Sequence, residues 1–142
     1  TFHIYGSGPE AEAIQSLKIK NIVFHGEVSR EQLHAELQQY DIAFIPLIRR
    51  IYGSVPSKIF EYTRLGIPVL YFAGGEGELI VNKLELGWSI PESKMGALQL
   101  FINSLTTEGL KEFSKNSVQE KSTKAFHFEE QFQAFINKVE NL

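Results

Sequence analysis

The chain has 142 residues, with 14 lysines and arginines, 17 aspartates and glutamates, and a formal net charge of −3. Its length fits one ordinary domain, so we expect residues 1–142 to form a single domain. The mild negative charge argues against nucleic acid as a partner, and the absence of cysteine excludes disulfides, thiolate metal sites and a cysteine nucleophile.

The N-terminal part of the chain contains two patterns in which a strand precedes a helix. Residues 2–5 are a β-rich run, residues 6–9 form a glycine turn, and residues 10–18 carry apolar side chains at helical spacing. The order repeats, because residues 21–26 predict a second strand and residues 29–40 predict a second helix that starts with a capping-box spacing.

The rest of the chain continues this alternation and then becomes helical. Residues 41–47 are an almost continuous apolar run, which is typical of a strand covered on both faces. We expect later helices at residues 54–65, 79–86, 95–105 and 128–139, a helix or loop at 111–121, and strands at 68–73 and 87–91. The apolar stripe of the last helix, with Phe128, Phe132, Phe135 and Val139, is more typical of core than of an interface, although a stripe left uncovered by a missing segment would become an interface.

Short strands that alternate with helices predict an α/β fold with a parallel sheet, because right-handed crossovers are the common way to connect such elements. We therefore expect a Rossmann-like, doubly wound parallel sheet with helices on both faces. The sequence starts directly in a strand, so we expect the usual first βα unit of such a sheet to be missing from it.

Ligands bind such sheets beyond the carboxyl ends of the strands, which directs attention to the loops there. Gly6 and Gly8 follow the first strand and could let the backbone approach a phosphate or sugar. The loop lacks the third glycine of the dinucleotide fingerprint, and by itself it is more typical of a tight turn. The Gly-Lys-Ser/Thr of a P-loop is absent.

The helix expected from residue 54 has the features of an anion site. Its free N–H groups and dipole favour a phosphate, and Ser57 can donate a hydroxyl. Lys58 and Glu61 share one helical face, where an ammonium can offset phosphate charge and a carboxylate can accept hydrogen bonds from ribose hydroxyls. The alternative is a solvated ion pair, which the spacing alone favours.

The next strand ends in a loop of glycines and acids, in which Gly75 could offer its amide and Glu78 could bind hydroxyls. A flexible, solvated loop is the equal alternative. The loop with Arg49, Arg50 and Tyr52 is expected to be solvated, although it could contact a sugar. The four histidines have no metal-ligand spacing, so we expect no metal site, and no residue is assigned as catalytic.

Three stretches together resemble a known family: FHIYGSGPE at residues 2–10, residues 21–47 with NIVFHGEVSREQL and DIAFIPL, and PSKIFEYTRLGIPVLYFAGGEGE at residues 56–78. They resemble the C-terminal, donor-binding domain of group 1 glycosyltransferases with the two-domain GT-B fold. The third stretch is similar to the form that recurs in bacterial surface-polysaccharide transferases. The resemblance continues through ELGWSIP into the helical tail.

The resemblance implies roles for particular residues. Glu61 would bind the donor ribose, Ser57 and Lys58 would face the phosphates, and Gly6 and Gly8 would lie near the donor. The nucleotide base would meet the segment containing His25, Gly26 and Val28, largely through the backbone. Gly53 stands where many relatives carry a glutamate that holds the transferred sugar, so Glu78 or amides near Gly75 are the candidates for that contact.

The resemblance also implies a function. The full-length protein would be a retaining transferase that moves a sugar from a nucleoside-diphosphate sugar to a glycan or lipid-linked acceptor, without another cofactor. An absent N-terminal domain would bind the acceptor, so this fragment alone is expected to be inactive. A cytoplasmic location follows, with peripheral association at the inner face of the plasma membrane as an option. A GT-B-fold nucleotide-sugar epimerase and a non-catalytic Rossmann-like interaction module are the alternatives.

Overall fold

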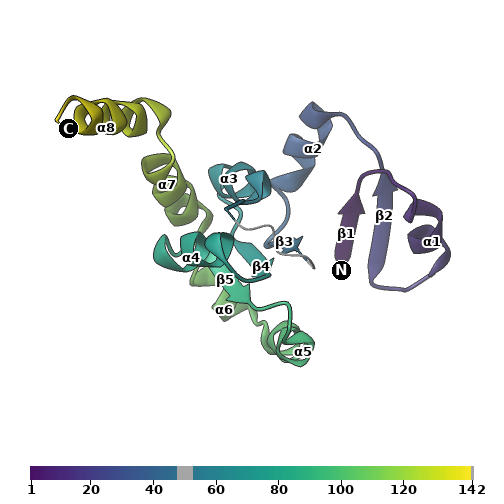
Figure 1. Cartoon of the computed structure of the whole chain (residues 1–142). Helices are drawn as coiled ribbons and strands as arrows, with labels where there is room; N and C mark the ends of the chain where they lie inside the picture. The colour runs from purple at the N-terminus through teal and green to yellow at the C-terminus, as the bar shows by residue number, and fades with distance from the viewer. Residues whose placement is uncertain (48–52, 142) are drawn as a thin grey trace. The chain divides into compact units, whose positions relative to one another are not determined.

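A computed structural model describes residues 1–47 and 53–141 of the chain. Strands and helices alternate up to residue 90, and four helices follow (Figure 1). The chain divides into two compact units, Thr1–Gln39 and Tyr40–Leu142, and each is described by itself. The expectation of a single domain over residues 1–142 stays a prediction. The loop residues Arg49, Arg50 and Tyr52 lie outside the described residues.

The first unit is built on two parallel strands, β1 (Phe2–Tyr5) and β2 (Ile22–Gly26), joined by helix α1 (Ala11–Ser16). The pairing shifts by one residue near the strand ends, so that Tyr5 pairs with Gly26. Helix α2 (Arg30–Leu37) follows β2. Its capping box is formed as the sequence predicts, because the Ser29 hydroxyl accepts from the Gln32 N–H and the Gln32 side chain accepts from the Ser29 N–H.

The second unit is built on three parallel strands in the order β3 (Ala43–Pro46), β4 (Val69–Phe72), β5 (Gly87–Ile90). Helix α3 (Ser57–Arg64) connects β3 to β4, and helix α4 (Glu76–Lys83) connects β4 to β5. Every residue of the central strand β4 is buried, which explains its continuous apolar sequence.

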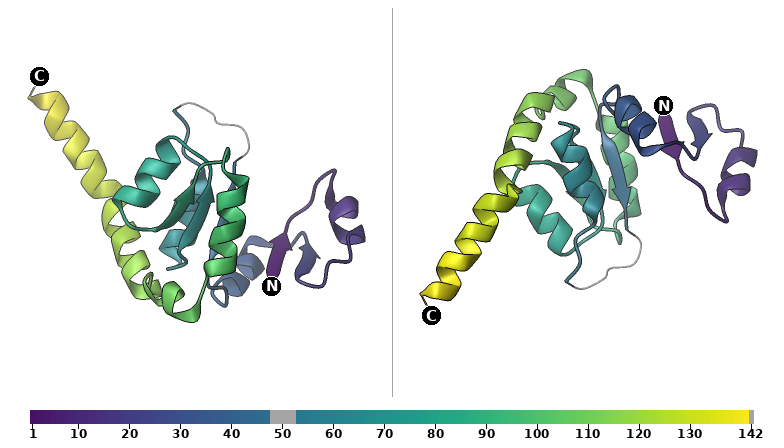
Figure 2. Two further views of the ribbon diagram at one scale, coloured as in Figure 1. Left: turned by 90° about the horizontal axis from the view of Figure 1, so that it is seen from below. Right: turned by 90° about the horizontal axis from the view of Figure 1, so that it is seen from above.

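Helices cover both faces of this three-stranded sheet, as predicted. Leu70 and Phe72 of β4 pack with Leu98 of α5 (Met95–Ser104) on one face. Figure 2 shows α5 on one side of the sheet and α4 with α7 (Lys115–Ala125) on the other. Between α5 and α7 lies the short helix α6 (Thr107–Lys111), and α8 (Phe128–Glu140) ends the described chain.

The mixed α/β, Rossmann-like fold is confirmed, with one difference: within the described residues, the strands form two parallel sheets, β1-β2 and β3-β4-β5.

The expectation for helix α8 is wrong. Its apolar stripe was predicted to face the core, yet none of its residues is buried. The exposed fractions along the stripe are 70% for Phe128, 51% for Phe132, 60% for Phe135 and 51% for Val139. Helical periodicity places these apolar side chains on one face of the helix, but within the described residues no other element packs over that face.

Candidate functional site

Two loops of the first unit are tied together at the carboxyl ends of β1 and β2. The Gly6 N–H donates to the Gly26 carbonyl at 2.8 Å, and the Ser7 hydroxyl donates to the Glu27 carboxylate at 2.9 Å. Gly6 and Gly26 have positive φ angles of 136° and 74°, where side chains are strained. Gly8 is exposed in the same loop. The structure therefore brings Gly6, Gly8 and Gly26 to one edge.

The side chain of His25 packs against strand β1. Its ring stacks on the Tyr5 ring with centroids 4.3 Å apart and an interplanar angle of 3°. Its Nε2 lies 2.9 Å from Nδ1 of His3, and the two rings are also stacked. These contacts hold the exposed imidazole beside strand β1, and Val28 further along the segment is half-buried.

Helix α3 begins at Ser57, three residues later than predicted, because Pro56 at the N-cap is extended with ψ of 125°. No side chain caps this helix start, and Ser57 is exposed there. The first turn of a helix presents N–H groups without intrahelical partners, and its dipole favours an anion. The start of α3 can therefore receive a negatively charged group.

Lys58 and Glu61 form an ion pair on this helix, with Nζ 2.8 Å from Oε2. The Lys58 side chain is 46% exposed and that of Glu61 only 19%, so the carboxylate is held on a partly covered face. The ammonium also lies 5.6 Å from the centre of the Tyr62 ring. Burial raises the pKa of Tyr62, so its hydroxyl stays protonated at neutral pH. A pair this exposed contributes less than about 1 kcal/mol to stability.

The loop after β4 places two carboxylates beside Gly74. A methyl group on Gly74 would lie 3.7 Å from the nearest oxygen of Glu78 and 3.6 Å from that of Glu92. Glu92 was missed by sequence reasoning. It comes two residues after β5, so the strand-end rule that selected Glu78 could have found it as well.

Two glycines shape this loop. Gly75 caps α4 with a φ of 85°, which favours glycine. A methyl group on Gly77 would lie 2.6 Å from the Tyr71 hydroxyl, so the first turn of α4 rests directly on that buried side chain.

At the end of the loop before α3, Gly53 is exposed with a φ of 73°. A glutamate there would be strained in this backbone conformation.

The segments described above match a known protein family. A family model for group 1 glycosyl transferases matches residues 1–111, which include every candidate residue described above. The chain belongs to the group 1 glycosyltransferases. A search of curated proteins found no match to it. The family match ends before α7 and α8, whereas the resemblance was expected to continue into the helical tail.

The candidate residues of this glycosyltransferase fall into two groups. Gly6, Gly8, His25, Gly26 and Val28 belong to the first unit, and their loops are linked by hydrogen bonds. The second unit contains the start of α3 and the loop after β4, with Ser57, Lys58, Glu61, Gly75 and Glu78. Each group lies at or just beyond the carboxyl ends of strands, where such sheets bind ligands.

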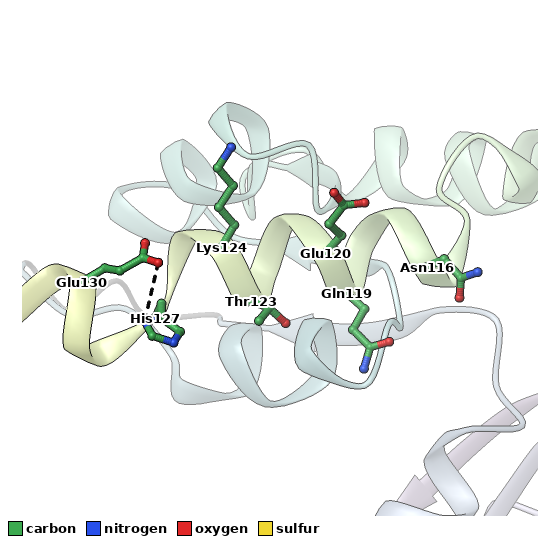
Figure 3. Close-up of a pocket in the computed structure, with 7 residues that line it drawn as sticks. All are labelled: Asn116, Gln119, Glu120, Thr123, Lys124, His127 and Glu130. Atoms are coloured by element: carbon green, nitrogen blue, oxygen red, sulfur yellow. Dashed lines mark ion pairs between the residues drawn. The ribbon is translucent and has the colours of Figure 1, made fainter.

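The glycosyltransferase also has a surface depression of about 510 Å³ along α7 and the first turn of α8 (Figure 3). It is lined by Asn116, Gln119, Glu120, Thr123, Lys124, His127 and Glu130. None of the candidate residues lines it. Its side chains point to different sides of α7 in Figure 3, so they do not converge on one ligand.

Within residues 1–47 and 53–141, no group of three or more histidines and carboxylates is arranged to hold a metal ion. In the same part of the chain, no helix has both the length and the apolar character needed to cross a membrane.

Proposed function

We propose that this chain binds the nucleotide of a nucleoside-diphosphate sugar, as the donor-binding part of a retaining glycosyltransferase with the GT-B fold. The full-length enzyme would transfer the sugar to a glycan or lipid-linked acceptor in bacterial polysaccharide biosynthesis. Membership of the group 1 family supports a glycosyltransferase, and the donor and acceptor classes are our proposal.

The observation that carries the proposal is the start of α3, where Lys58 and Glu61 lie within 2.8 Å of each other beside an uncapped helix terminus. A diphosphate at this terminus would accept from the first N–H groups and from the Ser57 hydroxyl. Lys58 would neutralise part of its charge. Glu61 would accept hydrogen bonds from the vicinal ribose hydroxyls, because an ionised carboxylate offers two acceptor oxygens.

The tied loops of the first unit support a second contact. Gly6 and Gly26 have no side chains to cover the backbone, and apart from their chain neighbours no atom of the described residues lies within 4 Å of where a methyl group on either would be. Backbone amides in such loops can approach a flat base or a phosphate closely. We propose that the base contacts the segment from Gly26 to Val28.

The transferred sugar would contact the loop after β4. Glu78 and Glu92 both approach Gly74, and neither has an ion pair or hydrogen bond within the described chain, so both are able to accept from sugar hydroxyls. This arrangement would take the role that the family resemblance gives to a glutamate at the position of Gly53 in many relatives.

The proposed reaction breaks the bond between the anomeric carbon and the diphosphate oxygen. The acceptor hydroxyl oxygen forms the new bond on the same face of the sugar, and its proton leaves with the nucleoside diphosphate. The chain would contribute by stabilising the negative charge that develops on the diphosphate, through the N-terminus of α3 and Lys58.

A titration of the full-length protein with UDP, GDP and dTDP tests the proposal. We expect one of them to bind, and Glu61→Ala to weaken that binding by about tenfold or more, since it removes hydrogen bonds to a charged acceptor. Glu120→Ala is the matched control, because Glu120 is an exposed helical carboxylate on α7. If none of the three binds, or if Glu61→Ala binds as well as the wild type, the proposal is wrong.

A further inference from the structure

Helix α3 has two faces with different partners. Ser57, Lys58 and Glu61 lie on the face proposed to bind the nucleotide. The opposite side, which includes Phe60 and Thr63, packs against α7. Because a helix is rigid, a contact on one face sets the direction in which the other face points.

One contact between α3 and α7 is a pair of buried hydroxyls. Thr63 and Ser122 are both fully buried, and their hydroxyl oxygens lie 2.8 Å apart. The Thr63 hydroxyl also donates to the carbonyl of Ile59 at 2.7 Å. Since a hydroxyl has one proton, Ser122 must be the donor to Thr63. The result is a chain of two hydrogen bonds that runs from Ser122 through Thr63 to the backbone of α3.

The backbone of Gly66, at the end of α3, closely approaches that of Lys115 in α7. The side-chain contacts that also hold the two helices together are more adaptable. The rings of Phe60 and Phe126 meet edge to face at 4.6 Å. The Gln119 side chain donates to the Arg64 carbonyl at 3.0 Å, and the Arg64 guanidinium donates to the Phe126 carbonyl at 3.2 Å. Long exposed side chains and ring contacts tolerate a small rotation of α3. A buried hydrogen bond between two short side chains does not, because an unpaired hydroxyl there is costly.

We propose that the Ser122–Thr63 hydrogen bond is a positioning contact that fixes the rotation of α3 and thereby the placement of Lys58 and Glu61. This inference rests on the proposed nucleotide site. Thr63 stands two residues after Glu61, so a rotation of α3 at this point moves the carboxylate directly. Helix α7 lies outside residues 1–111, which match the family model. The segment that would position the site is therefore not covered by that match.

Three variants of the full-length protein separate positioning from stability: Thr63→Val, Ser122→Ala and the double variant. Each is titrated with UDP, GDP and dTDP, and its unfolding midpoint is measured in urea. Thr63→Val leaves the Ser122 hydroxyl buried without its acceptor, so the midpoint falls and the affinity drops by about fivefold, the factor that corresponds to one hydrogen bond. The double variant leaves neither hydroxyl unpaired, so it regains most of the midpoint and keeps the loss of affinity.

Two controls accompany this series. Thr63→Ser keeps the hydroxyl and is expected to bind like the wild type. Thr123→Val makes the same exchange at an exposed position of α7, and is expected to change neither affinity nor midpoint.

The inference is overturned if affinity follows the unfolding midpoint through the whole series, so that the double variant regains both. It is also overturned if Thr63→Val and the double variant bind like the wild type while Glu61→Ala does not, and then the nucleotide site itself stands. If the wild type binds none of the three nucleotides, both the site and the positioning contact are wrong.

Discussion

Helices α3 and α8 are both amphipathic, but their apolar faces have different fates. On α3, Ile59 and Thr63 are completely buried against the sheet and α7. On α8, Phe128 and Phe135 remain 70% and 60% exposed. Periodicity therefore predicts that a helix has an apolar face, but it says nothing about whether another element covers it. That information depends on contacts between residues far apart in the chain.

The difference has an energetic consequence. Burying an apolar side chain fully contributes about 1.5–3 kcal/mol, and the contribution scales with the area removed from water. Ile59 is completely buried, so it contributes nearly the full burial free energy, whereas the phenylalanines of α8 keep more than half of their surface in water. We expect α3 and its contact with α7 to determine the stability of the second unit, and α8 to matter little.

The largest expected effect comes from Gly66→Ala, at the end of α3. A methyl group there would lie 2.6 Å from the Lys115 carbonyl oxygen of α7, and the φ of 77° is unfavourable for alanine. Strain and overpacking together predict a loss of about 2–5 kcal/mol in the free energy of unfolding, measured with urea. Gly96→Ala in α5 is the control: with no atom within 4 Å, it should gain up to about 1 kcal/mol. Equal stability of the two variants would contradict the close approach of α3 and α7.

Ile59→Ala is expected to have the next largest effect. Ile59 is 0% exposed, and its replacement removes apolar contacts and leaves a cavity, which costs about 2–4 kcal/mol in the free energy of unfolding. Ile102→Ala on α5 is the matched control, because Ile102 is 47% exposed and should lose far less. Urea denaturation of both variants gives the comparison. If Ile59→Ala lost as little free energy of unfolding as Ile102→Ala, Ile59 of α3 would not be part of the packed core.

Local sequence rules predicted the elements that depend on neighbouring residues. The capping box of Ser29 and Gln32 formed as expected, because both partners lie within one helical turn. The apolar run of residues 68–73 correctly predicted a strand, and every residue of that strand, β4, is buried. The start of α3 was placed three residues too early, because residues 54–56 precede the helix and Pro56 is extended there.

Residues whose partners are distant in the chain were missed. The position of Glu92 after a strand could have marked it as a candidate, but its approach to Gly74 depends on the parallel pairing of β4 with β5. Ser122 is separated from Thr63 by 59 residues, and a serine in a helix gives no sign of a buried partner. The nucleotide roles of Ser57, Lys58 and Glu61 stay predictions, because the ion pair between the latter two is compatible with a solvated pair as well.

A smaller effect is expected from the ion pair that joins α7 to the turn after α4. The Lys121 ammonium lies 2.6 Å from the Glu85 carboxylate and holds the pKa of Glu85 below its ordinary value. A carboxylate with a lowered pKa in the folded state adds stability above its unfolded pKa, and that stability is lost as the pH falls through the folded pKa. Urea denaturation between about pH 7 and pH 3 should therefore show a small advantage of the wild type over Lys121→Met that disappears in acid. Lys124→Met on the same helix is the control. An advantage that persists at low pH would show that Lys121 acts through its apolar stem instead.

The smallest effect is expected on α8, from Phe132→Ala. Phe132 is 51% exposed and stacks on the neighbouring Phe128, with ring centroids 5.8 Å apart. The lost contact is offset by the better helix propensity of alanine, so the free energy of unfolding of residues 1–142 should change by less than about 0.5 kcal/mol. Phe113→Ala is the matched control, because the Phe113 ring packs edge to face on Trp88 at 4.5 Å and should cost clearly more. The same pair of variants in the full-length protein sharpens the comparison with α3. If Phe132→Ala destabilises the full-length protein but not residues 1–142, the stripe of α8 is covered by residues outside this chain, and the two helices then differ only in where their partners come from.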